Sequence, residues 1–292
     1  MYYIIYPILY LFSLLPFFIL YRISDLAAFF LRRVVKYRRF IVLGNLAIAF
    51  PEKTEAERKQ IAKKFYQYFA DTFIESIKLL SLSKKQLIKR STAEFDLLNE
   101  YLAKGCSLNL VGGHQFNWEF INLLCSLEMS TPFVGIYMPV SNKALNKIFI
   151  NLRKRYGTVL ISATEYKNVS HDVFNRQYMF GLAADQNPGD PSNAYWIKFF
   201  GRPTPFVTGP EKGAIKNNVA VIYVAFKKVK RGYYHFETSL IAEHSAGTKV
   251  GELTMKYRDK LEQTIRQDPA NYLWSHRRFK FDWKPEYGEI LG

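Results

Sequence analysis

The stretch Leu108-Asn-Leu-Val-Gly-Gly-His-Gln-Phe-Asn-Trp-Glu-Phe120 contains a short apolar run, two glycines, a histidine and the start of an apolar helical pattern. The run is typical of a buried strand. Asn117 is a residue type that caps helices, so we expect a helix that begins at Trp118. His114 is then expected in a loop at the carboxyl end of a strand, with Glu119 in the first turn of the helix. This succession of strand, loop and helix is typical of an α/β sheet.

The same alternation continues along the chain. Short apolar runs predict strands at 107–111, 133–138, 158–162, 179–184 and 219–226, with helical patterns between them. Thr54 followed by Glu57 is a capping box that predicts the start of a helix, and residues 248–267 form a long amphipathic pattern. We therefore predict an α/β fold with a largely parallel sheet flanked by helices, in which functional groups gather at the strand ends.

The N-terminal segment from Tyr2 to Tyr21 has no charged side chain. About twenty apolar residues in a helix match a hydrocarbon core of roughly 30 Å. A cationic group of residues follows the segment: Arg22, Arg32, Arg33, Lys36, Arg38 and Arg39. No cationic leader precedes the run, which argues against a signal peptide. We predict an N-terminal membrane anchor helix, with the rest of the chain on the cytoplasmic side.

Two other arrangements of this segment stay open. Pro7 and Pro16 interrupt an ideal helix, so a half-inserted interfacial segment and a buried helix of a soluble protein also fit the pattern. A second amphipathic stretch at 23–35 can rest its arginines on anionic head groups. We place the domain boundary after this region, with an anchor and basic amphipathic segment at 1–40 and one cytosolic domain at 41–292.

The composition limits the classes of function. The chain has 292 residues, 49% of them hydrophobic, and a formal net charge of +16, so its surface attracts nucleic acid, anionic lipid or an acidic protein. Cys106 and Cys125 are too few for a disulfide framework or a zinc ribbon, and we expect both to pack as small apolar side chains. The sequence has no His-Glu-x-x-His, phosphate-loop or dinucleotide motif, so no metal or other cofactor is expected.

His114 and Glu119 are the candidate catalytic pair. A turn from loop to helix lets the carboxylate fold back toward the imidazole, which can then act as a base on an alcohol that attacks an ester or thioester. The alternative from these residues alone is that His114 is an ordinary loop histidine and that Glu119 only favours the helix N-terminus.

Five ordered motifs resemble those of the late acyltransferases of bacterial lipid A synthesis, within the glycerolipid acyltransferase superfamily. His114, Asn117, Trp118 and Glu119 resemble the His-x4-Asp/Glu motif in its Asn-Trp-Glu form. The other blocks are Gly44 to Glu52, Ala184-Asp-Gln186, Phe199-Phe-Gly201 with Thr204 and Thr208-Gly-Pro210, and Trp274 to Lys280. The resemblance spans nearly the whole chain.

The resemblance implies an enzyme of the inner membrane that moves a fatty acyl chain from acyl carrier protein, or from acyl-CoA, onto a hydroxyl group of a lipid A precursor. His114 would act as general base and Glu119 as the carboxylate that orients it. No nucleic acid partner is expected.

The residues expected to contact substrate are Asn117, Trp118, Arg153, Arg155, Asp185, Gln186, Arg277 and Arg278. Backbone N–H groups near Gly112 and Gly113 are candidates to stabilise the oxyanion, with a basic side chain such as Arg153 or Arg155 as the alternative. Asp185 and Gln186 can order the pocket, bind sugar hydroxyls or simply cap the end of a strand. Arg277 and Arg278 can grip phosphate, form a solvated basic face or bind nucleic acid.

The sequence also departs from the family pattern. Met138-Pro139 and Asn146 stand where the second block usually carries an Arg before Pro and an Asp further on, and Gln115-Phe116 replaces the usual Phe-Gly. A lysophospholipid or aminoacyl lipid acceptor therefore stays open. So do a hydrolase with the same dyad and a membrane-anchored basic binding protein without enzymatic activity.

Overall fold

The computed structural model describes the backbone of residues 1–292 and all side chains except those of residues 167 and 169–171. The helices are α1 (Tyr2–Leu14), α2 (Phe17–Phe29), α3 (Arg39–Ala49), α4 (Glu55–Lys78), α5 (Lys84–Arg90), α6 (Asp96–Ala103), α7 (Trp118–Glu128), α8 (Lys143–Arg153), α9 (Tyr166–Phe174), α10 (Gly209–Asn217) and α11 (Glu252–Gln267), with a π-helical turn at Phe30–Val34. The strands are β1 (Ser91–Ala93), β2 (Leu108–Gly112), β3 (Phe133–Tyr137), β4 (Val159–Ser162), β5 (Met179–Ala183), β6 (Ala194–Phe199), β7 (Arg202–Val207), β8 (Ala220–Lys230), β9 (Tyr233–Ala242) and β10 (Ile290–Leu291).

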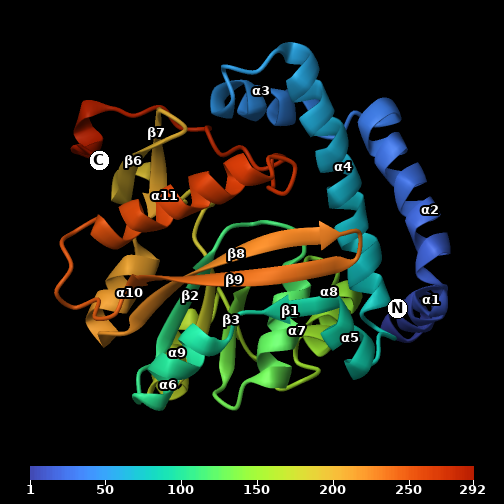
Figure 1. The fold of residues 1–292 in the computed structure, drawn as a ribbon, viewed down its shortest axis with the longest axis horizontal. Helices are drawn as coiled ribbons and strands as arrows, with labels where there is room; N and C mark the ends of the chain where they lie inside the picture. The colour runs from blue at the N-terminus through green and yellow to red at the C-terminus, as the bar shows by residue number, and fades with distance from the viewer.

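Seven of these strands form one sheet in the order β1-β9-β8-β2-β5-β3-β4 (Figure 1). All neighbouring pairs are parallel except β8 and β9, which form an antiparallel hairpin. The α/β fold and its largely parallel sheet are confirmed, and the five predicted strands lie within a few residues of their expected bounds. The long hairpin was not predicted, because β9 lacks the continuous apolar run by which the other strands were recognised.

The sheet is buried on both faces, as strand β8 illustrates. Successive side chains of a strand point to opposite faces. Ile222 and Val224 belong to a buried cluster that includes side chains of α5, α6 and α7. Val221 and Tyr223 belong to a second cluster that includes side chains of α3, α4 and α11. Each large apolar side chain buried in this way stabilises the fold by about 1.5–3 kcal/mol, so the two helical layers hold the sheet from both sides.

A smaller three-stranded sheet, in the order β10-β6-β7, lies beside α11 (Figure 1). Strands β6 and β7 form an antiparallel hairpin, and the end of the chain adds β10 parallel to β6. Phe199 and Phe206 of this hairpin are fully buried in the same cluster as α11. The carboxyl terminus is thereby tied to the body of the protein.

Both predicted helix caps are confirmed. The side chain of Thr54 accepts a hydrogen bond from the backbone N–H of Glu57, and the carboxylate of Glu57 accepts one from the N–H of Thr54, which completes a capping box at the start of α4. The side-chain oxygen of Asn117 accepts a hydrogen bond from the N–H of Glu119 at 3.2 Å, and α7 begins at Trp118.

The predicted continuous helix over residues 2–21 is wrong, because the chain breaks at Pro16 into α1 and α2. Pro16 has no N–H, and a residue before proline disfavours the helical region, so Leu15 is extended at ψ 144°. Among the residues that the structure describes, no single helix is both long and apolar enough to cross a membrane. The stretches Tyr2–Leu14 and Phe17–Val34, bent by 114°, meet that criterion only together, by length and composition.

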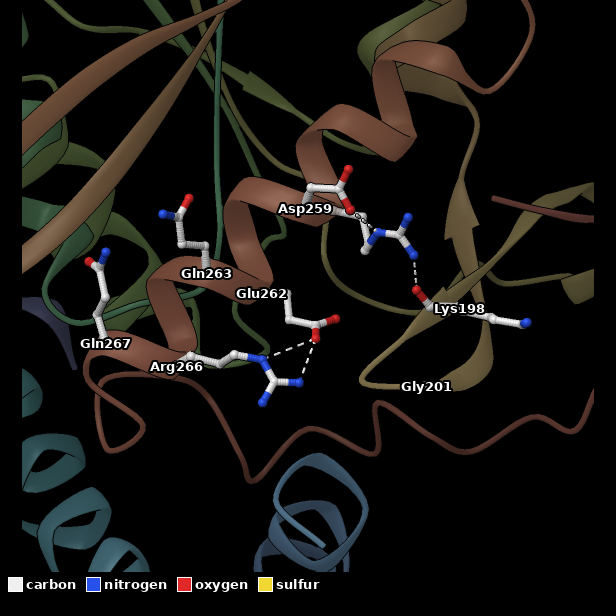
Figure 2. A pocket seen from close by; sticks show the side chains of 8 residues that line it. Lys198, Gly201, Asp259, Glu262, Gln263, Arg266 and Gln267 are labelled. Carbon is white, nitrogen blue, oxygen red and sulfur yellow. Dashed lines mark hydrogen bonds and ion pairs between the residues drawn. The ribbon is translucent and has the colours of Figure 1, made fainter. Parts of the chain in front are cut away.

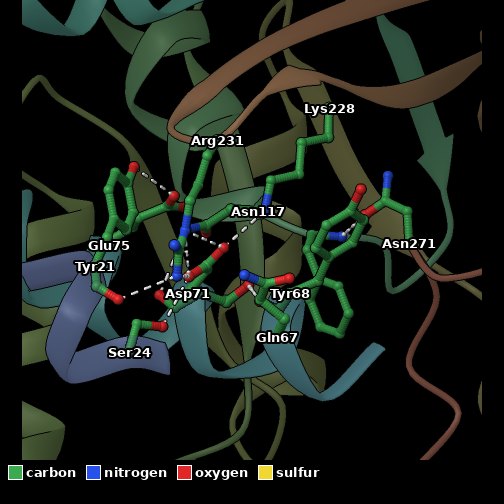
Figure 3. Close-up of polar contacts among 12 residues, drawn as sticks. Tyr21, Ser24, Gln67, Tyr68, Asp71, Glu75, Asn117, Lys228, Arg231 and Asn271 are labelled. Carbon is green, nitrogen blue, oxygen red and sulfur yellow. Dashed lines mark hydrogen bonds and ion pairs between the residues drawn. The ribbon is translucent and has the colours of Figure 1, made fainter. Parts of the chain in front are cut away.

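Helix α2 is attached to the body of the protein through a cluster of buried charges (Figure 3). Asp71 of α4, which is 1% exposed, accepts hydrogen bonds from Ser24 of α2 and from two cations of the β8–β9 hairpin, Lys228 and Arg231. Arg231 also bonds to Asp25 of α2. The carboxylate of Asp71 thus joins α2, α4 and the hairpin at one point.

Asp71→Ala is expected to lower the free energy of unfolding by about 3–5 kcal/mol, because it leaves the buried ammonium of Lys228 without its partner. The measurement is urea unfolding of the full chain in detergent. Glu100→Ala is the matched control, since it removes an exposed ion pair with Lys104. Its expected cost is below about 0.5 kcal/mol. Equal losses in both variants would contradict the role assigned to Asp71.

Candidate active site

The register of β2 and β5 determines which loops meet at the candidate site. These strands are parallel neighbours, and Gly112 is paired with Ala183 at their carboxyl ends. His114 and Asp185 each lie two residues beyond this pair, so the two loops emerge at the same edge of the sheet. The register therefore places an imidazole beside a carboxylate that is 71 residues away in the sequence.

Asp185 makes two hydrogen bonds with His114, one with the imidazole and one with the backbone N–H. Nδ1 of His114 and Oδ1 of Asp185 are 2.6 Å apart, and the backbone N–H of His114 donates to Oδ2 at 3.0 Å. The Asp185 side chain is 1% exposed and that of His114 is 23% exposed. The carboxylate is therefore shielded behind the ring, while the ring itself reaches solvent.

The charges of the pair shift both pKa values. Burial by itself would lower the pKa of His114, but the charge of Asp185 and the hydrogen bond to it raise that pKa above its ordinary value. Burial pushes the pKa of Asp185 upward, yet the contacts with His114 hold it at about 2. Asp185 is thus ionised at neutral pH and favours the tautomer with a proton on Nδ1, which leaves Nε2 of His114 as the basic nitrogen.

The expected pairing of Glu119 with His114 is corrected by this geometry. Glu119 is 3% exposed, and its carboxylate accepts hydrogen bonds from Nε of Arg153 at 3.0 and 3.1 Å and from Nη2 of the same guanidinium. It also accepts one from Nε1 of Trp118 at 3.2 Å. Because the Asn117 cap sets Glu119 in the first turn of α7, the carboxylate faces the end of α8 rather than Nδ1 of His114.

His114 and the ion pair of Glu119 with Arg153 line one cavity of about 380 Å³. The polar part of its lining comes from His114, Trp118, Glu119, Asn122, Tyr137 and Arg153. The remainder is mostly apolar and comes from strands β2, β3, β4, β5 and β8, from the residue after β3 and from helix α7: Leu110, Ile121, Phe133, Ile136, Met138, Leu160, Leu182, Val224 and Phe226. A pocket of this kind can hold a long apolar group with its reactive end at the imidazole.

Glycines on adjacent strands make room for the aromatic lining. A Cβ atom on Gly181 of β5 would lie 2.6 Å from the ring of Phe133, and one on Gly112 of β2 would lie 2.8 Å from the ring of Phe226. Both distances are too short for any side chain. The glycines therefore let the two rings lie directly against the sheet and line the cavity.

The closing segment of the chain supports the His114 loop from behind. Asn271 accepts a hydrogen bond from the N–H of Phe116 at 2.9 Å and donates one to the carbonyl of Phe226 at 2.8 Å. The carbonyl of His114 accepts a hydrogen bond from the N–H of Leu273 at 3.1 Å. This segment fixes the backbone on which the imidazole is carried.

Arg278 was expected to contact phosphate, and this expectation is corrected. The side chain is buried inside the protein. Arg278 is 1% exposed, and its Nη1 donates to Asn187 and to the carbonyl of Pro205, both at 2.8 Å. Its guanidinium lies over the ring of Phe206. Arg277 is exposed and lies outside the lining of the cavity.

The other residues predicted to contact substrate divide into two groups. Trp118 and Arg153 line the cavity, and Asp185 contacts the imidazole. Asn117 is 0% exposed, which corrects its expected substrate contact: it holds the start of α7. Arg155 donates to the carbonyl of Leu79 and, like the half-buried Gln186, is not part of the lining.

A larger depression of about 760 Å³ lies between α11 and the turn that joins β6 to β7 (Figure 2). Four of its charged side chains are paired: Arg266 with Glu262, and Arg258 with Asp259, while Arg258 also donates to the carbonyl of Lys198. It offers no base aimed into an enclosed space. Among the side chains that the structure describes, no three His, Cys, Asp or Glu groups come together as metal ligands.

Comparisons with known proteins agree with the motif order. Residues 1–281 match the family model described as bacterial lipid A biosynthesis acyltransferase. The chain is 22% identical to the lipid A biosynthesis lauroyltransferase of Escherichia coli (strain K12) over 94% of this chain and 89% of that relative. It is 25% identical to the lipid A biosynthesis acyltransferase of Haemophilus influenzae (strain ATCC 51907 / DSM 11121 / KW20 / Rd) over 85% of this chain and 79% of that relative.

Asp185→Asn is expected to lower the pKa of His114 by about one pH unit or more, because it removes the negative charge that stabilises the imidazolium. The pKa is read from an NMR titration of histidine-labelled protein. Glu119→Gln is the matched control and should leave the pKa of His114 close to its native value. A drop in Glu119→Gln as large as that in Asp185→Asn would restore Glu119 as the partner of the imidazole.

Proposed function

The chain belongs to the bacterial lipid A biosynthesis acyltransferase family, and on this basis we propose that it transfers a fatty acyl chain from a thioester donor to a hydroxyl group of a lipid A precursor. The observation that carries the proposal is the pair of His114 and Asp185 at the mouth of an apolar cavity. The names of both relatives, a lauroyltransferase and an acyltransferase of lipid A biosynthesis, support the choice of reaction and acceptor.

His114 is proposed as the general base. Nε2 removes the proton of the acceptor hydroxyl as its oxygen attacks the thioester carbonyl, and Asp185 stabilises the imidazolium that forms. The tetrahedral intermediate then expels the thiolate, and the imidazolium returns the proton to the leaving sulfur. The raised pKa of His114 suits this return step, because the protonated ring is a competent acid near neutral pH.

Arg153 is proposed to stabilise the oxyanion. The backbone N–H groups of His114, Gln115 and Phe116 already donate to Asp185, Gly113 and Asn271, so they are committed within the loop. Nε and Nη2 of Arg153 donate to Glu119, and Nη1 is the nitrogen that can turn toward the cavity. Glu119 thus acts through Arg153, whose guanidinium it orients at the wall of the site.

The apolar part of the cavity is proposed to hold the acyl chain. Phe133 and Phe226 form its inner wall, and each methylene that leaves water for this wall contributes about 0.8 kcal/mol. The donor is proposed to be acyl carrier protein, with acyl-CoA as the alternative. A chain with a formal charge of +16 suits an acidic carrier and a phosphorylated acceptor.

The N-terminal region is proposed to attach the enzyme to the cytoplasmic side of the inner membrane. Helices α1 and α2 lie along one side of the molecule (Figure 1). Apolar side chains of these helices and of the turn that follows them are exposed: Tyr3, Ile4, Ile8, Leu11, Leu14, Phe18, Leu26, Phe29 and Phe30. Six cations lie close behind them in the sequence, where they can meet anionic head groups.

His114→Ala is expected to lower the rate of acyl transfer by about 10²–10⁴-fold, the usual contribution of a general base. The assay uses purified protein, radiolabelled acyl carrier protein and a lipid A precursor, with the acylated lipid measured by thin-layer chromatography. His244→Ala is the matched control, because His244 is exposed and outside the cavity lining. It should retain the native rate.

The products of this assay separate the proposal from its alternatives. Acylated lipid A precursor supports the proposed acceptor, whereas free fatty acid alone would indicate a hydrolase. Acylation of a lysophospholipid in place of the precursor would mean that the acceptor is a lysophospholipid, while the reaction would still be acyl transfer to a hydroxyl group. A native protein that binds anionic lipid and forms no acyl product with any of these substrates would contradict an enzymatic function.

The double variant Ile8→Asp with Leu11→Asp is expected to reduce binding to anionic vesicles by at least about tenfold. Both side chains are exposed on α1, and burial of one such side chain is worth about 1.5–3 kcal/mol. The measurement is flotation of the full chain with vesicles that contain phosphatidylglycerol. Val250→Asp replaces an apolar side chain that is 71% exposed before α11, so it should float like the native protein. Equal flotation of all three proteins would overturn the proposed attachment surface.

A further inference from the structure

A second buried carboxylate, that of Glu75 in α4, lies among Tyr21 of α2, Asn117 and the β8–β9 hairpin (Figure 3). Glu75 is 0% exposed. Its Oε1 accepts a hydrogen bond from the hydroxyl of Tyr21 in α2 at 3.0 Å. Its Oε2 accepts hydrogen bonds from the hydroxyl of Tyr234 in β9 and from Nδ2 of Asn117 at 3.3 Å. One side chain therefore contacts α2, the hairpin and the loop that precedes α7.

The contact with Asn117 leads directly to the wall of the cavity. Asn117 is the N-cap of α7, and its side-chain oxygen holds the N–H of Glu119. Trp118 and Glu119 form the first turn of that helix, and both line the cavity. A displacement of the Asn117 amide therefore moves the residues that orient Arg153 beside the imidazole.

The contact with Tyr21 leads in the other direction, to a helix that carries exposed apolar side chains. Phe18 and Leu26 of α2 are exposed, whereas Ser24 on its inner face is buried and bonds to Asp71 at 2.7 Å. Helix α2 thus makes three side-chain hydrogen bonds to α4: Ser24 donates to Asp71, Tyr21 donates to Glu75, and Asp25 accepts one from Gln67 at 3.1 Å. The bond to Glu75 is the one that continues to Asn117.

Glu75 has a raised pKa. Burial and the charge of the neighbouring Asp71 raise the pKa of its carboxyl group above its ordinary value, although the charge of Lys228 and the hydrogen bonds from Tyr234 and Asn117 oppose the rise. The hydroxyls of Tyr21 and Tyr234 and the amide of Asn117 converge on the two oxygens of this carboxyl group. Each donor is then satisfied only if the other elements stay in place, because a buried polar group without its partner is unfavourable.

We propose that Glu75 is a positioning residue that couples the seating of helix α2 to the geometry of the first turn of α7. Tyr21 is the contact on the α2 side, and Asn117 is the contact on the side of the cavity. When α2 is seated on α4, Glu75 holds the Asn117 cap, and Trp118 and Glu119 take up the positions that shape the site. When α2 leaves, Glu75 loses one of its three donors and the cap loosens.

Tyr21→Phe tests this route, because it removes one hydroxyl and keeps the ring. Hydrogen exchange of the full chain in detergent, followed by mass spectrometry of a peptide that covers the first turn of α7, is expected to be about tenfold faster than in the native protein. Ser24→Ala is the matched control: it removes the hydrogen bond from α2 to Asp71 of α4 without touching Glu75. Exchange in α7 should stay at the native rate in Ser24→Ala. Equal exchange in Tyr21→Phe and Ser24→Ala would overturn the proposal.

Glu75→Gln separates hydrogen bonding from charge. The glutamine carbonyl can accept from Tyr234 and Asn117 while its amide donates to the Tyr21 hydroxyl, so exchange in α7 should stay within about twofold of native. Acceleration as large as in Tyr21→Phe would assign the effect to charge and contradict the hydrogen-bonded route.

Acyl transfer gives a second readout, which rests on the proposed function. Tyr21→Phe is expected to lower kcat about tenfold with little change in KM for the donor, whereas Ser24→Ala should leave both near native. An unchanged kcat in Tyr21→Phe would contradict the coupling. A native protein without acyl transfer would remove the proposed reaction, and the exchange measurement would then decide the coupling on its own.

Discussion

The hydrogen bond between Nδ1 of His114 and the carboxylate of Asp185 determines the orientation and the tautomer of the imidazole, and the rest of the site depends on it. It exists because β2 and β5 are parallel neighbours in register, so that two loops remote in sequence leave the sheet side by side. The buried carboxylate fixes the tautomer of the ring and leaves Nε2 to face the cavity. The closing segment of the chain supports this arrangement through Asn271, which ties the loop after His114 to strand β8.

Buried charge organises the rest of the molecule in a similar way. Asp71 and Glu75 lie one helical turn apart on α4, and between them they bond to α2, the β8–β9 hairpin and the cap of α7. Such groups are costly to bury alone, so they are stable only when all of their partners are present. In this protein the partners come from helix α2, the β8–β9 hairpin and the loop that precedes α7, and these parts are held in one arrangement.

Local patterns predicted much of the fold, and long-range pairing explains what they missed. Strands β2, β3, β4, β5 and β8, the Thr54 capping box and the Asn117 cap depend on a few consecutive residues, and these were predicted from them. The partner of His114 depends on which strand lies beside β2, which no local pattern states. The five-residue spacing between His114 and Glu119 suggested Glu119 as the partner. The signal for the partner seen in the structure was Asp185, an acidic residue directly after the apolar run at 179–184. The burial of Asn117 and Arg278 also follows from tertiary packing alone, since both residue types are usually exposed.

The tautomer of His114 can be read from the ¹⁵N chemical shifts of its two ring nitrogens above the pKa, with the signals assigned by their loss in His114→Gln. A proton on Nδ1 and a bare Nε2 are expected, because the carboxylate of Asp185 accepts from Nδ1 and the second nitrogen is the proposed base. A neutral ring with its proton on Nε2 would leave no basic nitrogen there and contradict the proposed mechanism.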